Sequence, residues 1–150
     1  MKKKEIPVLI DLAAIASYEG IQDDPIQMMT TGTLSHPEED LYLLQYRESQ
    51  PDEETGALQE CDVQLILKRD QVTMNRSGVF SNTMMFRKNH RYEGAYHTPY
   101  GDLSLAMLPR EVRCELGEEA GRVHLKYELS MQGSYASSNE LSLEYRIREN

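Results

Sequence analysis

The residue with the clearest chemical potential in this sequence is an arginine, Arg76, near the end of a predicted strand. Val72, Met74 and Arg76 are spaced two residues apart, so the period of a strand places all three on one face. Because its other members are apolar, we expect this face to point into the protein interior. A guanidinium in the interior must be paired or hydrogen-bonded. As the last residue of its strand, the arginine also has the length to reach solvent or loop carbonyls.

Tyrosines supply further polar groups that could work with this arginine. Residues 96–101 read YHTPYG, in which the proline pre-sets a turn and the glycine permits a positive φ. Such a corner aims Tyr100 at a rim or into the interior, although a stiff hairpin corner without a ligand explains the same residues. Tyr127 belongs to the inward stripe of a later strand. If the interior holds a ligand, the expected anchors are Arg76, Tyr96, Thr98, Tyr100 and Tyr127.

The other residue types that carry chemistry form no recognisable catalytic or metal site. The four histidines lack companions at zinc-ligand spacing, and the sequence contains no Gly-rich phosphate loop, G-x-S-x-G or H-E-x-x-H motif. Cys61 and Cys114 are far apart and fit buried small hydrophobes in a reducing compartment, with a single disulfide left open. Because catalysis needs converging titratable groups, we expect no enzyme, no metal and no cofactor.

The charge balance restricts the classes of partner. The chain has 16 basic and 25 acidic residues, a net charge of -9 and a pI near 4.9, which disfavours the phosphate contacts of nucleic-acid binding. No apolar run approaches the roughly 20 residues of a membrane-spanning helix. We therefore expect no nucleic acid and no membrane as partners, which leaves a small-molecule ligand and a homodimer open.

The N-terminal segment imitates a signal peptide, with three lysines followed by an apolar run. However, Asp11 interrupts that run, and Val8, Ile10 and Leu12 alternate as the residues of a strand do. Cleavage would remove the first strand of the fold. We therefore expect a cytoplasmic protein that keeps this segment.

Hydrophobic alternation predicts an all-β protein that forms one domain over residues 1–150. No segment shows a helical period over ten or more residues, and about ten short antiparallel strands at regular spacing favour a closed barrel or a sandwich. Gly32 interrupts one strand in the manner of a bend or bulge, and Pro109 ends or bends another. The predicted strands cover residues 6–18, 26–35, 41–49, 58–69, 72–76, 80–87, 90–97, 103–107 continuing at 112–116, 123–131 and 141–147.

Several short motifs recur at spacings that resemble a known family. They are Arg76-x-Gly78, Met84-x-Phe86, Tyr96-x-Thr98-Pro99-Tyr100-Gly101, Tyr127-x-Leu129 with Gly133, Asn139 and Leu141 and, more loosely, Thr30-x-Gly32 and Tyr46 near Glu48-Ser49. Together they resemble the signature of the YwiB-like proteins, an uncharacterised bacterial family with a calycin-type barrel. The sequence departs from that pattern at Asn82, where a serine is usual, and at Pro109, where a threonine is usual.

This resemblance implies a single closed antiparallel β-barrel of about 8–10 strands, calycin- or lipocalin-like, with no assigned activity. In relatives with calycin-type barrels, inward arginines either plug the end of the barrel or hold a carboxylate-bearing ligand. Barrels of about eight strands are either filled by side chains or hold one small ligand. Our first hypothesis is therefore a non-enzymatic barrel that binds a small, partly apolar or carboxylate-bearing molecule in its lumen.

The alternative hypothesis is a structural or interaction protein whose barrel is filled by its own side chains. Its work would then be done by the outer surface or a dimer face. The expected filling residues are Met28, Met74, Met84, Phe86, Met107 and Met131. The expected outward apolar residues, which would form an association patch, are Ile15, Met29, Leu43, Ile66 and Met85.

Overall fold

The computed structural model describes residues 5–18, 21–22, 24–51, 55–79 and 81–148. The described residues form eleven β-strands and no helix, which confirms the predicted all-β class. The strands are β1 (Ile6–Tyr18), β2 (Ile21–Gln22), β3 (Ile26–Glu38), β4 (Leu41–Pro51), β5 (Leu58–Leu67), β6 (Gln71–Gly78), β7 (Asn82–Arg87), β8 (Tyr92–Thr98), β9 (Gly101–Glu115), β10 (Ala120–Met131) and β11 (Ser134–Ile147).

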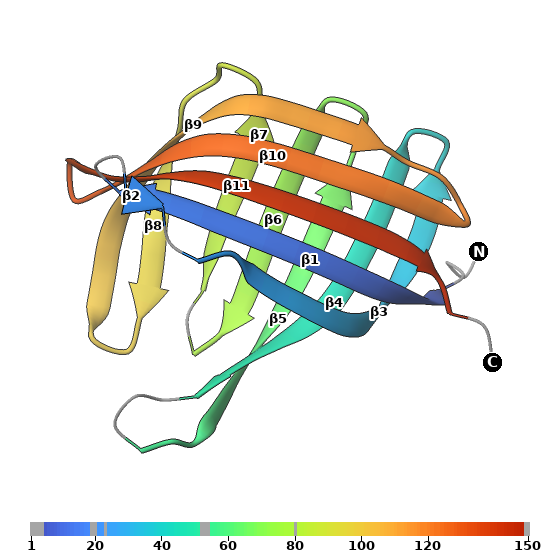
Figure 1. The fold of residues 1–150 in the computed structure, drawn as a ribbon, viewed down its shortest axis with the longest axis horizontal. Helices are drawn as coiled ribbons and strands as arrows, with labels where there is room; N and C mark the ends of the chain where they lie inside the picture. Colours follow the sequence, from blue (N-terminus) through green and yellow to red (C-terminus); the bar gives the residue numbers. More distant parts are fainter. Residues whose placement is uncertain (1–4, 19–20, 23, 52–54, 80, 149–150) are drawn as a thin grey trace.

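The strands form an up-and-down antiparallel barrel that is nearly closed. The order around the sheet is β7-β6-β5-β4-β3-β1-β11-β10-β9-β8, with the short β2 paired to the end of β1. Figure 1 shows β9, β10, β11 and β1 crossing in front of the more upright strands β4 to β7. Between β7 and β8 the described residues form a single bridge, Ser81 with His97, through N–H···O distances of 3.0 and 2.8 Å. This weakly bonded junction is called the seam below.

Alternation of side chains along each strand builds the interior. In β7, Asn82, Met84 and Phe86 are buried while the residues between them are exposed. Val72 and Met74 are also buried, which confirms that the strand face carrying Arg76 points inward. The core contains residues from every strand of the barrel path except β8, from which the half-buried Tyr92 packs against it. Because apolar burial is the main stabilising term in folding, this interior holds the barrel together.

Two strand irregularities differ from the predicted ones. The register around Gly32 is regular, and the glycine is needed because a Cβ there would overlap the Gln45 carbonyl of β4. The irregularity of the β3–β4 pairing lies instead between Ser35 and Glu38. At Pro109 strand β9 continues, and the β9–β10 register shifts beside it, between Lys126 and Tyr127. A bulge suits proline because proline has no N–H to donate to a ladder.

Most strand boundaries agree closely with the sequence pattern, and β1 covers the predicted residues 6–18. Strand β11 begins at Ser134, well before the predicted start at 141, because it stays paired with β10 up to a tight turn. Strand β7 begins at Asn82, and Phe80, the predicted first residue, lies outside the described residues.

The two ends of the barrel are built differently. The end near both termini, called the closed end, is filled by Tyr145, whose hydroxyl donates to the Gly117 carbonyl (2.7 Å) and accepts from the Gly117 N–H (3.1 Å). A side chain at Gly121 would overlap the Tyr145 ring, so the glycine makes room for it. His36 stacks on Tyr42 at the same end, with ring centroids 3.9 Å apart. The opposite end, called the mouth, carries the β4–β5, β6–β7, β8–β9 and β10–β11 connections.

Candidate functional site

An ion pair between Arg76 and Glu48 forms the centre of the mouth. The Arg76 Nε and Nη2 atoms donate to the two carboxylate oxygens of Glu48, each at 3.2 Å, in a bidentate arrangement. The side chains of Arg76 and Glu48 are 21% and 16% exposed, so the pair is mostly buried but still accessible to solvent. Burial lowers the pKa of Arg76, but the attraction and hydrogen bonds of Glu48 outweigh this and raise it overall. The guanidinium therefore stays charged and paired with Glu48.

Three tyrosines lie close enough to sense this ion pair. Burial raises the pKa of Tyr46, helped by the Glu48 charge and by the hydrogen bond that the phenol donates to Glu48. Burial also raises the pKa values of Tyr96 and Tyr127, although the positive charge of Arg76 acts in the opposite direction on both. All three phenols are consequently neutral near pH 7.

Asn82 is the residue of the site whose hydrogen bonding is incomplete. It is 7% exposed, lies on the inner face of β7 and is paired in register with Arg76 of β6. Its Oδ1 atom is buried and has no hydrogen-bond partner among the described residues. Leaving a buried acceptor unpaired costs about 1–3 kcal/mol, and such atoms are rare in native proteins. We call the set Arg76, Glu48, Tyr46, Tyr96, Tyr127 and Asn82 the mouth cluster.

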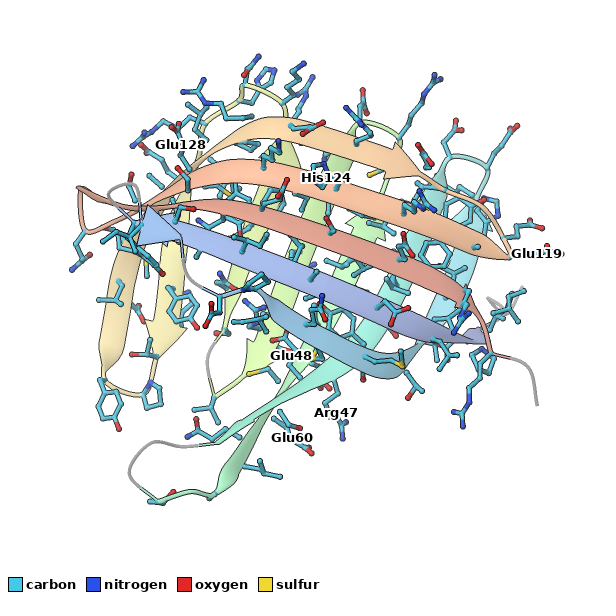
Figure 2. All side chains as sticks on the ribbon, in the orientation of Figure 1. Arg47, Glu48, Glu60, Glu119, His124 and Glu128 are labelled. Carbon is cyan, nitrogen blue, oxygen red and sulfur yellow. The ribbon has the colours of Figure 1, made fainter. Side chains whose placement is uncertain are left out.

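Strand pairing explains why residues so far apart in sequence meet. Tyr46, Val63, Arg76 and Asn82 stand side by side on β4, β5, β6 and β7. Glu48 is two residues beyond Tyr46 on the same strand, hence on the same inner face. Figure 2 shows Glu48 on the inner side of the wall, whereas Arg47 and Glu60 project together from the outer side, where they form an ion pair.

The structure brings together three of the five residues expected to bind a ligand, Arg76, Tyr96 and Tyr127. Thr98 instead stabilises the β8–β9 turn, because its Oγ1 donates to the Gly101 carbonyl (2.7 Å) and accepts from the Tyr100 N–H (3.1 Å). Tyr100 is 88% exposed at the tip of that turn. The stiff corner is therefore present, and it directs the Tyr100 side chain away from the interior.

Sequence reasoning missed Glu48, Tyr46 and Asn82 as members of the site. One signal was available, because Tyr42, Leu44, Tyr46 and Glu48 share one face by the two-residue period. An acid on an inward face is expected to have a basic partner, and Arg76 is the inward arginine. The incomplete hydrogen bonding of Asn82 leaves no trace in the sequence.

Exposed apolar side chains surround the mouth. They come from the end of β1, from β2, from the first residues of β3 and β5, from the β6–β7 connection and from the β8–β9 turn. The most exposed members are Tyr18, Ile21, Ile26, Leu58, Val79 and Tyr100, and we call this set the apolar rim. Exposed apolar residues gathered around one opening are typical of a binding surface.

Two broad grooves, each of about 500 Å³, lie on the outer wall rather than at the mouth. One contains the outward residues Gln45, Arg47, Asp62, Gln64 and Asn75, and the other contains Asp11, Gln27, Met29, Ser142 and Glu144. In the first groove the Asn75 amide donates to Gln64 (3.3 Å), and Arg47 pairs with Asp62 (3.1 Å). The side chains that form these bonds are already paired with one another, so we place the candidate site at the mouth.

Comparisons with known proteins agree with this fold. A family model described as "Domain of unknown function (DUF1934)" matches residues 10–143. The chain belongs to this family. An uncharacterised β-barrel protein, YwiB of Bacillus subtilis, is 21% identical over 143 residues, which are 95% of each chain.

The crystal structure of that Bacillus subtilis protein has the same fold. It superimposes with a TM-score of 0.83 at 20% identity, over 98% of this chain and 96% of the other. The predicted resemblance to the YwiB-like proteins and the predicted β-barrel are thereby confirmed. The function of the family is unknown.

The described residues also bear on metal sites and on membrane-spanning helices. No three histidine, cysteine, aspartate or glutamate side chains converge in a way that would hold a metal ion. In the same part of the chain, no helix has the length and apolar character to cross a membrane.

Proposed function

We propose that this protein is a non-enzymatic binding protein that holds a small, partly apolar molecule at the mouth of its barrel. The polar head of the molecule would lie in the mouth cluster, and its apolar part would contact the apolar rim. The observation that carries the proposal is the buried Oδ1 of Asn82, for which the described part of the chain provides no hydrogen-bond partner. A hydrogen-bond donor on a bound molecule would satisfy it.

Access to the site supports this proposal. The Arg76 and Glu48 side chains keep about a fifth of their surface in contact with solvent, so a head group can reach them without unfolding of the barrel. The interior beyond them is filled by apolar side chains such as Met74, Met84 and Phe86. We therefore place the molecule at the mouth and not deep in the lumen. Its apolar part then has the exposed Val79 and Leu58 within the same opening.

The proposed compartment is the cytoplasm. Cys61 and Cys114 do not form a disulfide bond, and Cys61 is buried. Burial raises the pKa of the Cys114 thiol to about 12, which makes it a poor nucleophile. Two cysteines that form no disulfide fit a reducing compartment.

Native mass spectrometry of the gently purified protein tests the proposal. We expect a reproducible small adduct on the wild-type protein, and loss of that adduct in Asn82→Val, which removes the unpaired acceptor. Thr83→Val is the matched control, because Thr83 is the next residue of the same strand and points outward. The proposal is wrong if no adduct is found and a panel of cell extracts leaves the melting temperature unchanged.

A second function is favoured by one feature of the outer wall. The outer wall carries a row of outward-facing residues that are paired in register across four strands. The row consists of Leu43 of β4, Ile66 of β5, Thr73 of β6 and Met85 of β7. Met85 is 40% exposed, so this row offers an apolar strip for a second protein molecule. If the strip mediates a homodimer, light scattering will give a dimer for the wild type and a monomer for Met85→Lys. A monomeric wild-type protein rejects this function.

A further inference from the structure

The geometry points to a ligand with a neutral head group that donates a hydrogen bond, as in a long-chain alcohol or primary amide, rather than to a carboxylate. This inference rests on the proposed function and specifies the chemical class of the molecule bound at the mouth cluster.

The charges of the mouth cluster cancel. Arg76 is positive, Glu48 is negative and makes two hydrogen bonds with it, and the three tyrosines are neutral. A carboxylate placed beside Arg76 would therefore also lie beside Glu48, and like charges at short distance repel. A cationic head would meet the same penalty from Arg76. A buried ionic head group needs an opposite charge that is not already paired, and the mouth cluster offers no such charge to either ion.

The surroundings of the mouth also disfavour an anion. Asp24, Glu60, Asp62 and Asp102 are exposed on strands and turns at this end. Arg47 is already paired with two of these acids, Glu60 and Asp62, and Arg76 is paired with Glu48. With a net charge of -9 for the whole chain, the field around the mouth repels anionic molecules.

The unpaired Oδ1 of Asn82 requires a donor. It accepts and cannot donate, so a carboxylate head would leave it unsatisfied whereas an O–H or N–H would not. A hydroxyl can donate to Asn82 and at the same time accept from a neighbouring phenol or guanidinium N–H. Arg76 donates to Glu48 through Nε and Nη2. Because a guanidinium has five N–H groups, other N–H groups of Arg76 remain to donate to a ligand. One neutral hydroxyl or amide can thus donate to Asn82 and also accept a hydrogen bond from a donor of the mouth cluster.

The test compares three probes with the same ten-carbon chain, namely 1-decanol, decanoate and decylamine, each below its aggregation concentration. Dissociation constants are measured by titration calorimetry on the intact protein at pH 7. We expect decanol to bind at least about tenfold more tightly than decanoate, since one hydrogen bond to a buried acceptor is worth roughly that factor. We also expect it to bind more tightly than decylamine, because the positive charge of Arg76 repels the ammonium group. Asn82→Val should weaken decanol binding about tenfold, and Thr83→Val should leave it unchanged.

A second variant tests the role of charge independently of Asn82. Glu48→Gln keeps the shape of the side chain and removes its negative charge, so Arg76 loses its counter-ion. We expect this variant to prefer decanoate over decanol, which reverses the wild-type order. Circular dichroism verifies that the variant is folded before it is compared with the wild type.

The outcomes separate this inference from the proposed function. If wild-type protein binds decanoate or decylamine most tightly at a site that Asn82→Val weakens, the neutral-head inference is overturned and the mouth site remains. If no probe binds and native mass spectrometry finds no adduct, the proposed function itself fails. If all probes bind equally in wild type, Asn82→Val and Thr83→Val, binding does not involve the mouth cluster and both are rejected.

Discussion

The closed end and the mouth place tyrosines in two different kinds of surroundings. At the closed end, Tyr145 is 1% exposed, and its hydroxyl is hydrogen-bonded to both backbone groups of Gly117. At the mouth, Tyr46, Tyr96 and Tyr127 surround an ion pair and a buried oxygen to which no described residue donates a hydrogen bond. The closed end is therefore complete as a structure, whereas the mouth carries an unfavourable feature that stability alone does not explain.

The difference suggests that the closed end serves stability and the mouth serves binding. Incomplete polar groups tend to persist where binding uses them, because selection for stability would otherwise remove them. The seam between β7 and β8 adds to the contrast, since Asn82 and Tyr96 come from its two strands. Local opening costs least where few hydrogen bonds hold neighbouring strands. We therefore expect mutations at the closed end to affect folding and mutations at the mouth to affect binding.

The largest effect is expected from Tyr145→Ala at the closed end. Loss of a fully buried aromatic ring costs about 3–5 kcal/mol in free energy of unfolding, because a cavity remains and the Gly117 groups lose their partner. Urea denaturation of wild type and variant measures the difference. A loss below about 1 kcal/mol would mean that the closed end is not the structural anchor of the barrel.

A smaller loss is expected from Arg76→Met at the mouth. Removing one partner of a mostly buried ion pair leaves Glu48 uncompensated, and partial solvent access limits the cost to about 2–3 kcal/mol. The double variant Arg76→Met/Glu48→Leu should return to within about 1 kcal/mol of wild type, because both charges are then absent. Urea denaturation of all four proteins measures the coupling. A double variant as unstable as the sum of the single variants would show that the pair is not a unit.

Asn82→Val is expected to increase stability, in contrast to the two variants above. In the absence of ligand, replacing the residue whose Oδ1 is unpaired by an apolar β-branched residue should stabilise the barrel by about 1 kcal/mol. The melting temperature of the ligand-free protein should therefore rise. A clear decrease would indicate that the amide contributes to folding, and the contrast between the two ends would then weaken.

The smallest effect concerns the protonation of His36 at the closed end. The hydrogen bond to the Glu39 carbonyl raises its pKa above 6.5, with burial opposing and Glu118 assisting. Because the pKa of His36 is higher in the folded than in the unfolded state, protonation of His36 stabilises the folded protein. This stabilisation is fully present below pH 6.5, the unfolded-state pKa, and is lost as the pH rises through the folded-state pKa. Histidine titration by NMR should give a midpoint above 6.5, and Glu118→Gln should lower it. A midpoint at or below 6.5 contradicts the assignment.

Local patterns allowed much of the fold to be predicted from sequence. Alternation in segments such as Val8–Leu12 and Val123–Met131 reports which side chains face the core, and that information requires no knowledge of the partner strand. The inward direction of Arg76 followed from the same rule and is confirmed. The resemblance to the YwiB-like proteins then distinguished a barrel from a sandwich.

The composition of the mouth cluster could be predicted only in part, because it depends on register. Glu48 and Arg76 are 28 residues apart, and their contact is set by how β4, β5 and β6 align. Glu48 also precedes a polar loop, where a solvent-exposed acid is the usual expectation. The direction of Tyr100 depends on turn geometry that YHTPYG alone does not determine. The unpaired oxygen of Asn82 is a property of its whole surroundings.

The pairing of the first long strand with the last has a consequence for how the protein is made. Ten residue pairs, from Val8 with Ile147 to Ser17 with Ser138, join β1 to β11. During synthesis β1 leaves the ribosome well before β11, its pairing partner, has been translated. At roughly 5–20 residues per second, one edge of β1 waits several seconds for its partner. An unpaired apolar strand edge invites aggregation, so the nascent barrel is most vulnerable in the interval before β11 emerges.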